Sequence, residues 1–341
     1  MRYKLLGRSG LRVSELCLGT MTFGDDWGWG APKEESRKMF DAFAESGGNF
    51  IDTANNYTNG TSEKFVGEFI ASDRDRFVVA TKYTLSERAE DPNYGGNHRK
   101  NMFRSIEGSL KRLNTDHIDL LWLHMWDGVT PIEEVMRALD DLVRSGKVLY
   151  VGISDTPAWV VSQANAIAEL RGWSRFIAYQ GEYSLASRAP ERDIMPMTQA
   201  LEMAFTPWGI LEGGEMTGKY NAPSDEPKRS SDTSPRIKSL AAELMSLAEE
   251  IGRTPSQIAI NWVRQQPYLV VPIIGSRSEK HLRDNMSCLE FELTPDQIKR
   301  LSAASPIDLG FPHSFLASDH VRGLIFGKTF ARIDNHRVRV G

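Results

Sequence analysis

The stretch IDLLWLH, residues 118–124, decides how this chain folds. Its apolar residues follow one another directly instead of alternating with polar ones. Such continuous apolarity is typical of a β-strand that is buried on both faces, as in a parallel sheet. The run ends on His124, so the predicted strand carries an imidazole to one edge of that sheet.

Seven further runs along the chain share this strand pattern. They are VSELCLG (13–19), NFID (49–52), RFVVATK (76–82), YVGISD (150–155), FIAYQGEY (176–183), ALEMAFTPW (200–208) and LVVPIIG (269–275). Helical patterns separate them, and three of these open with a threonine, a proline and a Glu or Gln, which predicts a capping box with proline in the first turn. These starts are TPIE (130–133), TPSQ (254–257) and TPDQ (294–297), and residues 236–251 form a further amphipathic helix.

Eight buried strands, each followed by a helix, predict an α/β protein that closes into a (β/α)8 TIM barrel. An open doubly wound sheet is the alternative, but such a sheet normally carries G-x-G-x-x-G after its first strand. Here the first strand ends in LGTMTFG (18–24), which lacks that motif. We expect a single domain over residues 1–341, with an N-terminal β-hairpin (3–6 against 11–13), loops at 85–99 and 222–236, and an extended C-terminal tail from residue 305.

The composition restricts the classes of function. A net charge of −4 argues against a nucleic-acid or acidic-membrane binder, which needs a basic face. Apolar runs are too short to span a membrane, and the charged N-terminus does not resemble a secretory signal. The chain has two cysteines, Cys17 and Cys288, and no CxxC. We therefore expect reduced thiols, no metal site and a cytoplasmic protein.

Four polar side chains at the ends of neighbouring predicted strands form a proton-transfer set: Asp52, Tyr57, Lys82 and His124. Barrel enzymes place their chemistry at the carboxyl ends of the strands, where these residues converge. A lysine cation lowers the pKa of a nearby phenol, and an aspartate pairs the lysine. A neutral imidazole can orient a carbonyl oxygen. The set suits protonation of a developing alkoxide. Taken singly, each residue has a structural explanation, as a cap, a surface phenol, a strand end or a core histidine.

At these residues the chain resembles the aldo-keto reductase family. The matching stretches include FIDTANNYTNGTSEKFVG (50–67), IDLLWLH (118–124), TPWGILEGGEMTGKY (206–220) and PIIGSRSEKHLRDN (272–285). The resemblance implies an NADPH-dependent carbonyl reductase in which Tyr57 is the general acid/base. It also implies that Lys82 tunes Tyr57, that Asp52 supports Lys82 and that His124 orients the substrate. The segment DTPAWVV (155–161) resembles the aryl-alcohol dehydrogenase-like branch.

The same resemblance implies a set of NADP-binding residues, with NADPH preferred over NADH. Ser154 and Gln180 match the residues that hold the nicotinamide carboxamide, whereas Asp155 replaces the usual asparagine. Phe205 stands at the position of the ring that stacks on the nicotinamide, and Arg277 at the position that binds the 2′-phosphate, with Lys280 as a helper. The remaining residues of the set are Gly19, Thr20, Met21, Asp52, Thr206, Pro207, Trp208, Ile210, Ile274, Gly275, Ser276, His281 and Asn285.

Two of these assignments have structural alternatives. Asp155 precedes Thr156-Pro157 and could cap a helix that starts there. If it is instead ionised beside the positively charged nicotinamide, we expect it to favour the oxidised cofactor. Phe205 could pack in the core at its strand end. Arg277 could be an exposed loop cation.

Aromatic residues follow several predicted strand ends and predict a wide apolar substrate pocket: Phe23, Trp27, Trp29, Trp126 and Trp208. The expected substrate is a small-molecule aromatic or bulky apolar aldehyde or ketone, with its alcohol in the reverse direction. The alternative is a nicotinamide-binding regulatory subunit resembling the potassium-channel β-subunits. A barrel isomerase or lyase without nicotinamide is a third class. The sequence allows a homo-oligomer.

Overall fold

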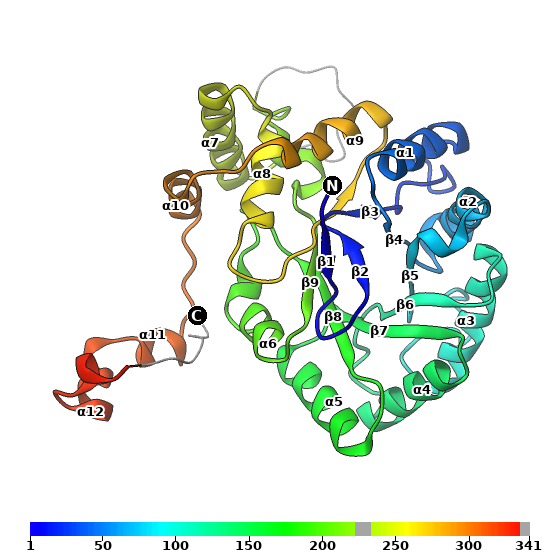
Figure 1. The fold of residues 1–341 in the computed structure, drawn as a ribbon, viewed down its shortest axis with the longest axis horizontal. Helices are drawn as coiled ribbons and strands as arrows, with labels where there is room; N and C mark the ends of the chain where they lie inside the picture. Colours follow the sequence, from blue (N-terminus) through cyan, green and yellow to red (C-terminus); the bar gives the residue numbers. More distant parts are fainter. Residues whose placement is uncertain (222–232, 335–341) are drawn as a thin grey trace.

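A computed structural model describes residues 1–221 and 233–334. Its centre is a barrel of eight parallel strands, in the order β10-β3-β4-β5-β6-β7-β8-β9 (Figure 1). The strands are β3 (Cys17–Gly19), β4 (Phe50–Asp52), β5 (Val78–Tyr83), β6 (Ile118–Leu123), β7 (Val148–Ser154), β8 (Phe176–Glu182), β9 (Ala204–Trp208) and β10 (Ile273–Gly275). Backbone bonds of 2.8 Å from Phe205 N–H to Leu269 O, and from Val271 N–H to Phe205 O, close the ring between β9 and the segment before β10. The predicted (β/α)8 barrel is confirmed.

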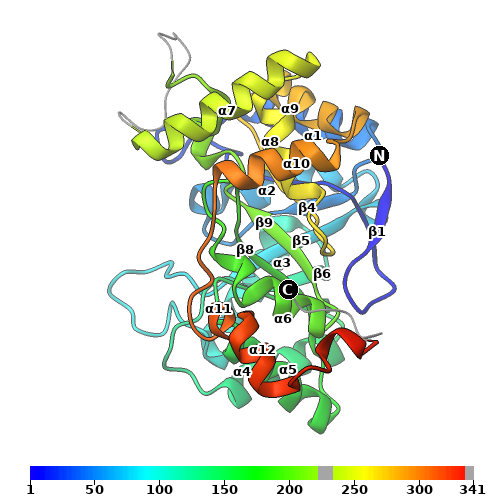
Figure 2. The same cartoon turned by 90° about the vertical axis from the view of Figure 1, so that its left-hand side faces the viewer.

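Helices surround the barrel, as the alternation of patterns predicts. They are α1 (Lys33–Glu45), α2 (Thr61–Ile70), α3 (Arg99–Leu113), α4 (Ile132–Arg144), α5 (Ala158–Arg171), α6 (Ile194–Ala200), α7 (Pro235–Ile251), α8 (Pro255–Arg264), α9 (Glu279–Met286) and α10 (Pro295–Ala304). Figure 2 shows α7, α8 and α10 gathered at one end of the ring. The predicted polar loop after β5 extends to the start of α3. Most of the other predicted loop, residues 222–232, lies outside the described residues, and its last residues already belong to α7.

Two of the three predicted capping boxes form. The hydroxyls of Thr254 and Thr294 each accept the backbone N–H three residues later, and the glutamine there bonds back to the threonine N–H. The third prediction was wrong. The Thr130 hydroxyl donates to Asp127 Oδ2 at 2.6 Å, and α4 begins after Pro131 without a side-chain cap. Asp127 also accepts the backbone N–H groups of Val129 and Thr130, so its carboxylate holds Thr130 in the loop, one residue before the N-cap position of α4.

The barrel separates two apolar cores. Out-facing strand residues pack against the helices, while an inner cluster fills the barrel and includes Cys17, Phe50, Leu120 and Trp122. The predicted N-terminal hairpin is confirmed as β1 (Tyr3–Leu5) paired with β2 (Arg12–Ser14). Leu6 and Val13 of this hairpin belong to the inner cluster and are fully buried. The hairpin therefore closes the amino-terminal end of the barrel. Cys17 and Cys288 are buried free thiols.

The C-terminal tail leaves the barrel after α10 and folds into α11 (His313–Leu316) and α12 (Asp319–Phe326), which project to the left of the ring in Figure 1. The Arg188 guanidinium bonds to the carbonyls of Ser302 and Ser305 and so holds the start of this tail. None of the helices in the described part of the chain is both long and apolar enough to cross a membrane.

Candidate active site

The four residues of the predicted proton-transfer set come together at the carboxyl ends of three adjacent strands. Asp52 ends β4, Lys82 lies near the end of β5, and His124 directly follows β6. Tyr57 begins the short 3-10 helix η1 (Tyr57–Gly60), five residues after Asp52. The parallel register pairs β4 with β5 and β5 with β6, so tertiary packing brings the side chains to one edge.

Lys82 is the centre of the cluster. Its fully buried ammonium forms an ion pair with Asp52 Oδ2, and it donates to Tyr57 OH and to the Thr53 carbonyl, each at 3.1 Å. Gln180 Nε2 from β8 donates to Asp52 Oδ1 at 2.9 Å. Both carboxylate oxygens of Asp52 and all three N–H bonds of the Lys82 ammonium thus have hydrogen-bond partners, as a buried ion pair requires.

The turn that carries Tyr57 is strained. Thr58 and Asn59, which follow Tyr57 directly, have left-handed φ values of 45° and 55°. Such a conformation costs about 1–3 kcal/mol for each residue other than glycine and persists only where the surroundings enforce it. Here the Thr58 hydroxyl donates to Phe23 O at 2.6 Å and accepts from Ser62 N–H at 3.1 Å. The turn held in this way places the Tyr57 hydroxyl within hydrogen-bond distance of Lys82.

Burial dominates the protonation of the phenol. Burial raises the pKa of Tyr57, and the opposing effect of Lys82 does not bring it below the ordinary value of 10. Burial alone would lower the pKa of Lys82, but Asp52 and Tyr57 raise it. Lys82 lowers the pKa of Tyr57, as expected of a neighbouring cation, but desolvation is the larger effect and leaves the pKa above its ordinary value. Tyr57 is thus a protonated phenol whose oxygen accepts a hydrogen bond from Lys82.

His124 is a neutral imidazole. Burial, together with the nearby Lys82 cation, lowers the pKa of His124 to about 3. Its ring lies edge-on to Tyr57, with centroids 6.0 Å apart and an angle of 81° between the rings. Nδ1 is buried without a hydrogen-bond partner in the described residues. A neutral ring in this place can donate one hydrogen bond toward the same point that Tyr57 faces.

Two of the predicted pocket tryptophans extend an aromatic row from this point. Trp27 meets Tyr57 edge-on at 6.4 Å and packs against Trp29 at 5.5 Å. Both tryptophans are half-buried in the long loop after β3. Trp126 is half-buried beyond β6 and packs on the outer core. The assignment of Phe23 to the pocket wall was wrong, since its ring is fully buried against Phe69.

Asp155 lies in a left-handed turn, with φ 40°, directly after β7. Its Oδ1 accepts from Trp208 Nε1 at 3.3 Å. Burial raises the pKa of Asp155 to about 6, and the charge of Asp155 in turn raises the pKa of Tyr57, so the carboxyl is electrostatically coupled to the proton-transfer set. The alternative that Asp155 caps α5 was wrong, because α5 begins after Pro157 without a side-chain cap.

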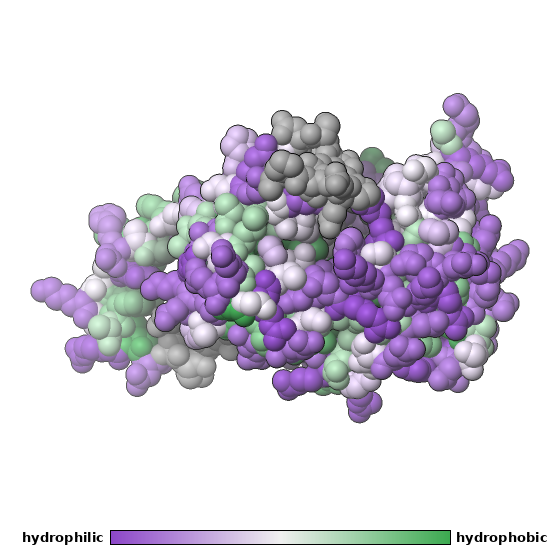
Figure 3. Space-filling model, turned by 90° about the horizontal axis from the view of Figure 1, so that it is seen from above, coloured by the Kyte–Doolittle hydropathy of each residue, from purple (hydrophilic) through white to green (hydrophobic). Residues whose placement is uncertain are grey.

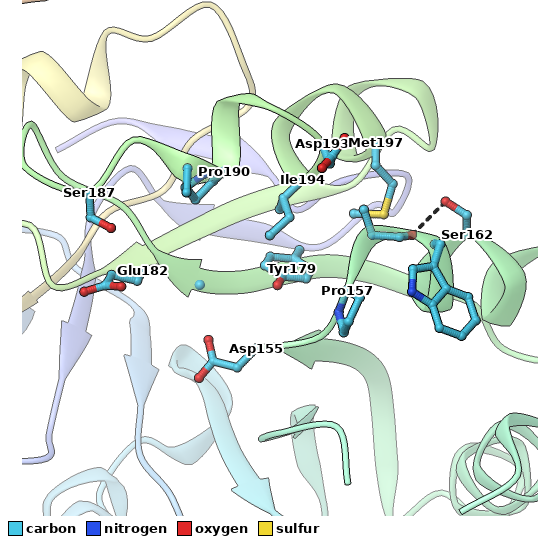
Figure 4. Close-up of a pocket in the computed structure, with 14 residues that line it drawn as sticks. Asp155, Pro157, Ser162, Tyr179, Glu182, Ser187, Pro190, Asp193, Ile194 and Met197 are labelled. Carbon is cyan, nitrogen blue, oxygen red and sulfur yellow. Dashed lines mark hydrogen bonds between the residues drawn. The ribbon is translucent and has the colours of Figure 1, made fainter. Parts of the chain in front are cut away.

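Beside Asp155 lies a cavity of about 720 Å³ between the amino-terminal halves of α5 and α6. Asp155 and Glu182 stand at one side of it, and Tyr179 forms its floor (Figure 4). Pro157, Ile194 and Met197 line the rest of the region drawn. The cavity therefore lies outside the barrel wall, adjacent to the proton-transfer set, and is largely apolar with acidic groups on its rim.

The residues predicted to hold a nicotinamide carboxamide fit that group. Ser154 Oγ is buried and has no hydrogen-bond partner among the described residues, which leaves a donor and acceptor for a ligand. A buried hydroxyl without a partner is rare in native proteins. The Gln180 side chain donates one amide hydrogen to Asp52, so its carbonyl oxygen and its second amide hydrogen can bond to a ligand. Ser154 ends β7 and Gln180 lies beside it on β8, in direct register.

Phe205 does not present a face to the barrel mouth. Its ring is fully buried in the outer core, 6.0 Å from Tyr179 and 5.9 Å from Tyr183. The structure therefore shows the core packing, and the stacking role was a wrong assignment. The next residue, Thr206, is buried and donates to Tyr179 O at 3.1 Å. Pro207 and Ile210 are also buried, whereas Trp208 is partly exposed.

The loops after β3 and β10 lie side by side. Thr22 Oγ1 donates to the Ser276 carbonyl, while the Thr20 hydroxyl is used inside the barrel on Asp52 O at 2.9 Å. Gly19 and Gly275 are paired in register, with Met21 half-buried in the first loop and Ile274 buried in β10.

The predicted phosphate site lies at the start of α9, where Arg277 and His281 are exposed and Asn285 is buried. Some first-turn amides of this helix are already used. Glu279 N–H donates to Glu35 Oε1 at 2.7 Å, and His281 N–H donates to the Ser278 hydroxyl at 3.3 Å. The helix N-terminus is therefore less free to receive a phosphate than the sequence suggests, and side chains would carry more of that role.

Sequence reasoning missed the contacts that hold the cluster. Neither the bond from Gln180 to Asp52 nor the bond from Lys82 to Thr53 O was foreseen. The period-2 alternation of β8 could have revealed the first, because Ala178 and Gln180 point into the same barrel interior. The carbonyl contact has no sequence signal, since every residue has a backbone oxygen.

Comparison with known proteins agrees with this geometry. Residues 15–306 match the model of the Aldo/keto reductase family. A norsolorinic acid reductase of Aspergillus flavus is 42% identical over 92% of this chain and 83% of its own length. A putative aryl-alcohol dehydrogenase of Saccharomyces cerevisiae is 41% identical over 93% and 90%, and an aryl-alcohol dehydrogenase [NADP(+)] of Phanerodontia chrysosporium is 40% identical over 89% and 86%. The chain belongs to the aldo/keto reductase family of enzymes.

Proposed function

We propose that this chain reduces aromatic or bulky apolar aldehydes and ketones to alcohols with NADPH, using Tyr57 as the general acid. The observation that carries the proposal is the 3.1 Å contact between the Lys82 ammonium and the Tyr57 hydroxyl beside a neutral His124. The names of the relatives support carbonyl reduction by a nicotinamide-dependent enzyme. The whole barrel acts as one domain.

The residues have distinct roles in this proposal. NADPH, when bound, supplies a hydride to the carbonyl carbon. His124 donates a hydrogen bond that holds the carbonyl oxygen, and Tyr57 gives that oxygen its proton as negative charge develops. Lys82 stabilises the phenolate that is left, and Asp52 keeps Lys82 charged in a buried place. Ser154 and Gln180 would hold the carboxamide.

Cofactor preference would depend on residues at both ends of the site. Arg277, with Ser276, Lys280 and His281, would favour the 2′-phosphate of NADPH over NADH. An ionised Asp155 would favour the oxidised, positively charged ring. Because the pKa of Asp155 is raised to about 6, this preference is expected to strengthen as the pH rises above 6.

The aromatic row explains the proposed substrate class. Trp27 and Trp29 continue directly from Tyr57, so an aromatic aldehyde oriented by His124 would lie along ring faces and edges. The polar edge of Trp27 is already satisfied, because its Nε1 hydrogen is used on Asn59 Oδ1 at 3.3 Å. A flat, apolar substrate body gains most from such a wall.

The test is oxidation of NADPH, followed at 340 nm with 4-nitrobenzaldehyde, for the wild type and for Tyr57→Phe. Loss of a positioned general acid costs about 10²–10⁴-fold in rate, so the variant is expected to lose kcat by that factor. Binding of NADPH, measured by quenching of tryptophan fluorescence, should be retained. Tyr150→Phe, on the barrel strand β7, is the matched control and should keep its activity.

Each other outcome contradicts a definite part of the proposal. Activity that does not respond to Tyr57→Phe would remove Tyr57 from its role. Binding of NADPH without turnover in the wild type would favour the nicotinamide-binding regulatory subunit. Failure to bind NADPH at all would favour a barrel isomerase or lyase.

A further inference from the structure

The C-terminal arm, residues 311–334, exposes an unusual amount of apolar surface. Leu324 is 71% exposed and Ile325 is 59% exposed, and Val321 is the one buried residue of this described segment. Further exposed apolar residues are Phe311, Phe315, Leu316, Phe326, Phe330 and Ile333. Figure 3 shows apolar surface on the projection at the left of the molecule. Exposed apolar side chains gathered on one segment in this number are typical of an interaction site.

The arm is an ordered unit with its own internal contacts. The Ser318 hydroxyl caps α12 by accepting Val321 N–H at 3.3 Å. The rings of Phe326 and Phe330 lie 5.1 Å apart. These internal contacts reduce the ordering entropy that opposes docking. The arm leaves its own barrel at one place, where Arg192 donates to Phe311 O at 3.1 Å and His313 meets Asp193 at 3.3 Å.

That place is the rim of the cavity of about 720 Å³ described above, here called the α5–α6 groove. Asp193 lines the groove and also holds His313 of the arm. Trp159, which is 69% exposed, lines the groove. Pro190 and Ile194 line it as well (Figure 4). None of residues 311–334 lines the groove, so the apolar surfaces of the arm and of the groove lie near each other without meeting.

The charges of the two surfaces are complementary. The lining of the groove includes three acidic residues, Asp155, Glu182 and Asp193, and no lysine or arginine. The arm carries three cations, Arg322, Lys328 and Arg332, against two carboxylates, Asp319 and Asp334. Arg322 pairs with Asp319 at 3.5 Å inside the arm, so Lys328 and Arg332 are the cations that would face the groove. Opposite charges around apolar centres favour association and fix its orientation.

We propose that two copies of this chain form a two-fold symmetric dimer in which the arm of each copy docks in the α5–α6 groove of the other. The root of the arm and the groove are adjacent on one copy. A two-fold axis beside Asp193 therefore places both arms opposite both grooves, which gives a closed, reciprocal interface. A second copy fits better than the arm's own barrel, because the preformed helices project away from the groove beside which they begin.

The first test is the molar mass of the full-length protein by light scattering after size exclusion, at several micromolar concentrations. The expected mass is twice the 38.3 kDa of the chain. The double variant Leu324→Glu/Ile325→Glu in the arm, and separately Trp159→Glu in the groove, should each give the monomer mass. Leu170→Glu is the matched control, because Leu170 is 86% exposed at the far end of α5 and should leave the dimer intact. Circular dichroism checks that each variant is folded.

The second test identifies which chain the arm reaches. The chain's two cysteines are buried, so Ile325→Cys and Trp159→Cys introduce accessible thiols. The two variants are mixed, one of them with a size tag, and treated with a short bis-maleimide. Cross-links between tagged and untagged chains support the exchange. The proposal is overturned if a double variant is linked within one chain, or if the protein is a monomer at all concentrations. It is also overturned if the dimer survives both sets of charge substitutions, or if the arm sediments with phosphatidylcholine vesicles.

Discussion

Asp155 links the stability of the fold to pH through one buried carboxyl group. It occupies a left-handed backbone position, is largely buried and accepts a hydrogen bond from Trp208. Its pKa is raised from 3.8 to about 6 by burial. An asparagine would fill the same volume and accept the same bond without carrying a charge. Keeping the carboxyl therefore has a cost to stability that depends on pH.

We expect Asp155→Asn to stabilise the fold at pH 8. A carboxyl with a pKa that is higher in the folded state binds more protons there than in the unfolded chain. Stability therefore falls as the pH rises from 3.8 to about 6, and the cost is fully present above that range. Removing the charge should raise the free energy of unfolding at pH 8 by at most about 3 kcal/mol. Urea unfolding at pH 5, 6.5 and 8 measures this difference.

The same variant tests the effect on the cofactor. At pH 8, Asp155→Asn should weaken the binding of NADP+ relative to that of NADPH, so the ratio of the NADP+ to the NADPH dissociation constant should rise. The rise should be smaller at pH 5.5. A ratio that is the same in both proteins, or a stability difference that does not change with pH, would show that Asp155 is not ionised and buried as the structure indicates.

At the scale of elements, the close packing of α2 on α3 decides the residue at position 67 more strongly than helix propensity does. Gly67 lies in α2 where that helix crosses the carboxyl end of α3. A Cβ at Gly67 would meet the backbone of Leu113, at 2.4 Å from its carbonyl oxygen. Backbone atoms cannot rotate away as a side chain can. The glycine is thus required by the crossing, although glycine is a poor helix former.

We expect Gly67→Ala to destabilise the protein despite the gain of about 1 kcal/mol in helix propensity, because α2 and α3 must move apart. A loss of about 1–3 kcal/mol in the free energy of unfolding is expected from such overpacking. Gly108→Ala in α3 is the matched control, since its new Cβ would meet the flexible Arg112 side chain at 3.1 Å. Equal effects of the two changes in urea unfolding would contradict this account of the crossing.

At the scale of the whole molecule, the barrel depends on a segment outside the eight repeats. The N-terminal hairpin inserts Leu6 and Val13 into the inner core, and Lys4 Nζ donates to Val270 O at 2.6 Å. The turn at Gly7 has φ 59°, and a Cβ there would lie 2.0 Å from Ile177 O. The hairpin thus packs against β8 and the segment before β10, and it covers the amino-terminal end of the barrel, opposite the end that carries the proton-transfer set.

Leu6→Ala should therefore cost about 2–5 kcal/mol of the free energy of unfolding, as for other fully buried leucines. Its neighbour Leu5 is 54% exposed, and Leu5→Ala should change stability by less than about 0.5 kcal/mol. Thermal and urea unfolding of the two variants measure the difference. A similar small effect for both would mean that the hairpin does not seal the barrel.

The amino-acid sequence by itself determined the eight strands, the starts of α8 and α10, and which polar side chains gather at the strand ends. Buried parallel strands need unbroken apolar runs, and capping residues act within a few positions of one another, so both leave local signals. Thr254 and Thr294 followed their signals, while Thr130 did not, because hydrogen bonds to Asp127 hold it in the loop before α4.

Only the tertiary structure decided how those residues behave. The burial that keeps Tyr57 protonated and His124 neutral comes from elements distant in the chain, as does the Gln180 contact to Asp52. Phe23 was expected in the pocket wall from its place after a strand, and Phe205 on the nicotinamide from the family resemblance, yet both are enclosed by rings from other elements. Desolvation and long-range packing depend on all neighbours at once, whereas a sequence pattern records only those nearby along the chain.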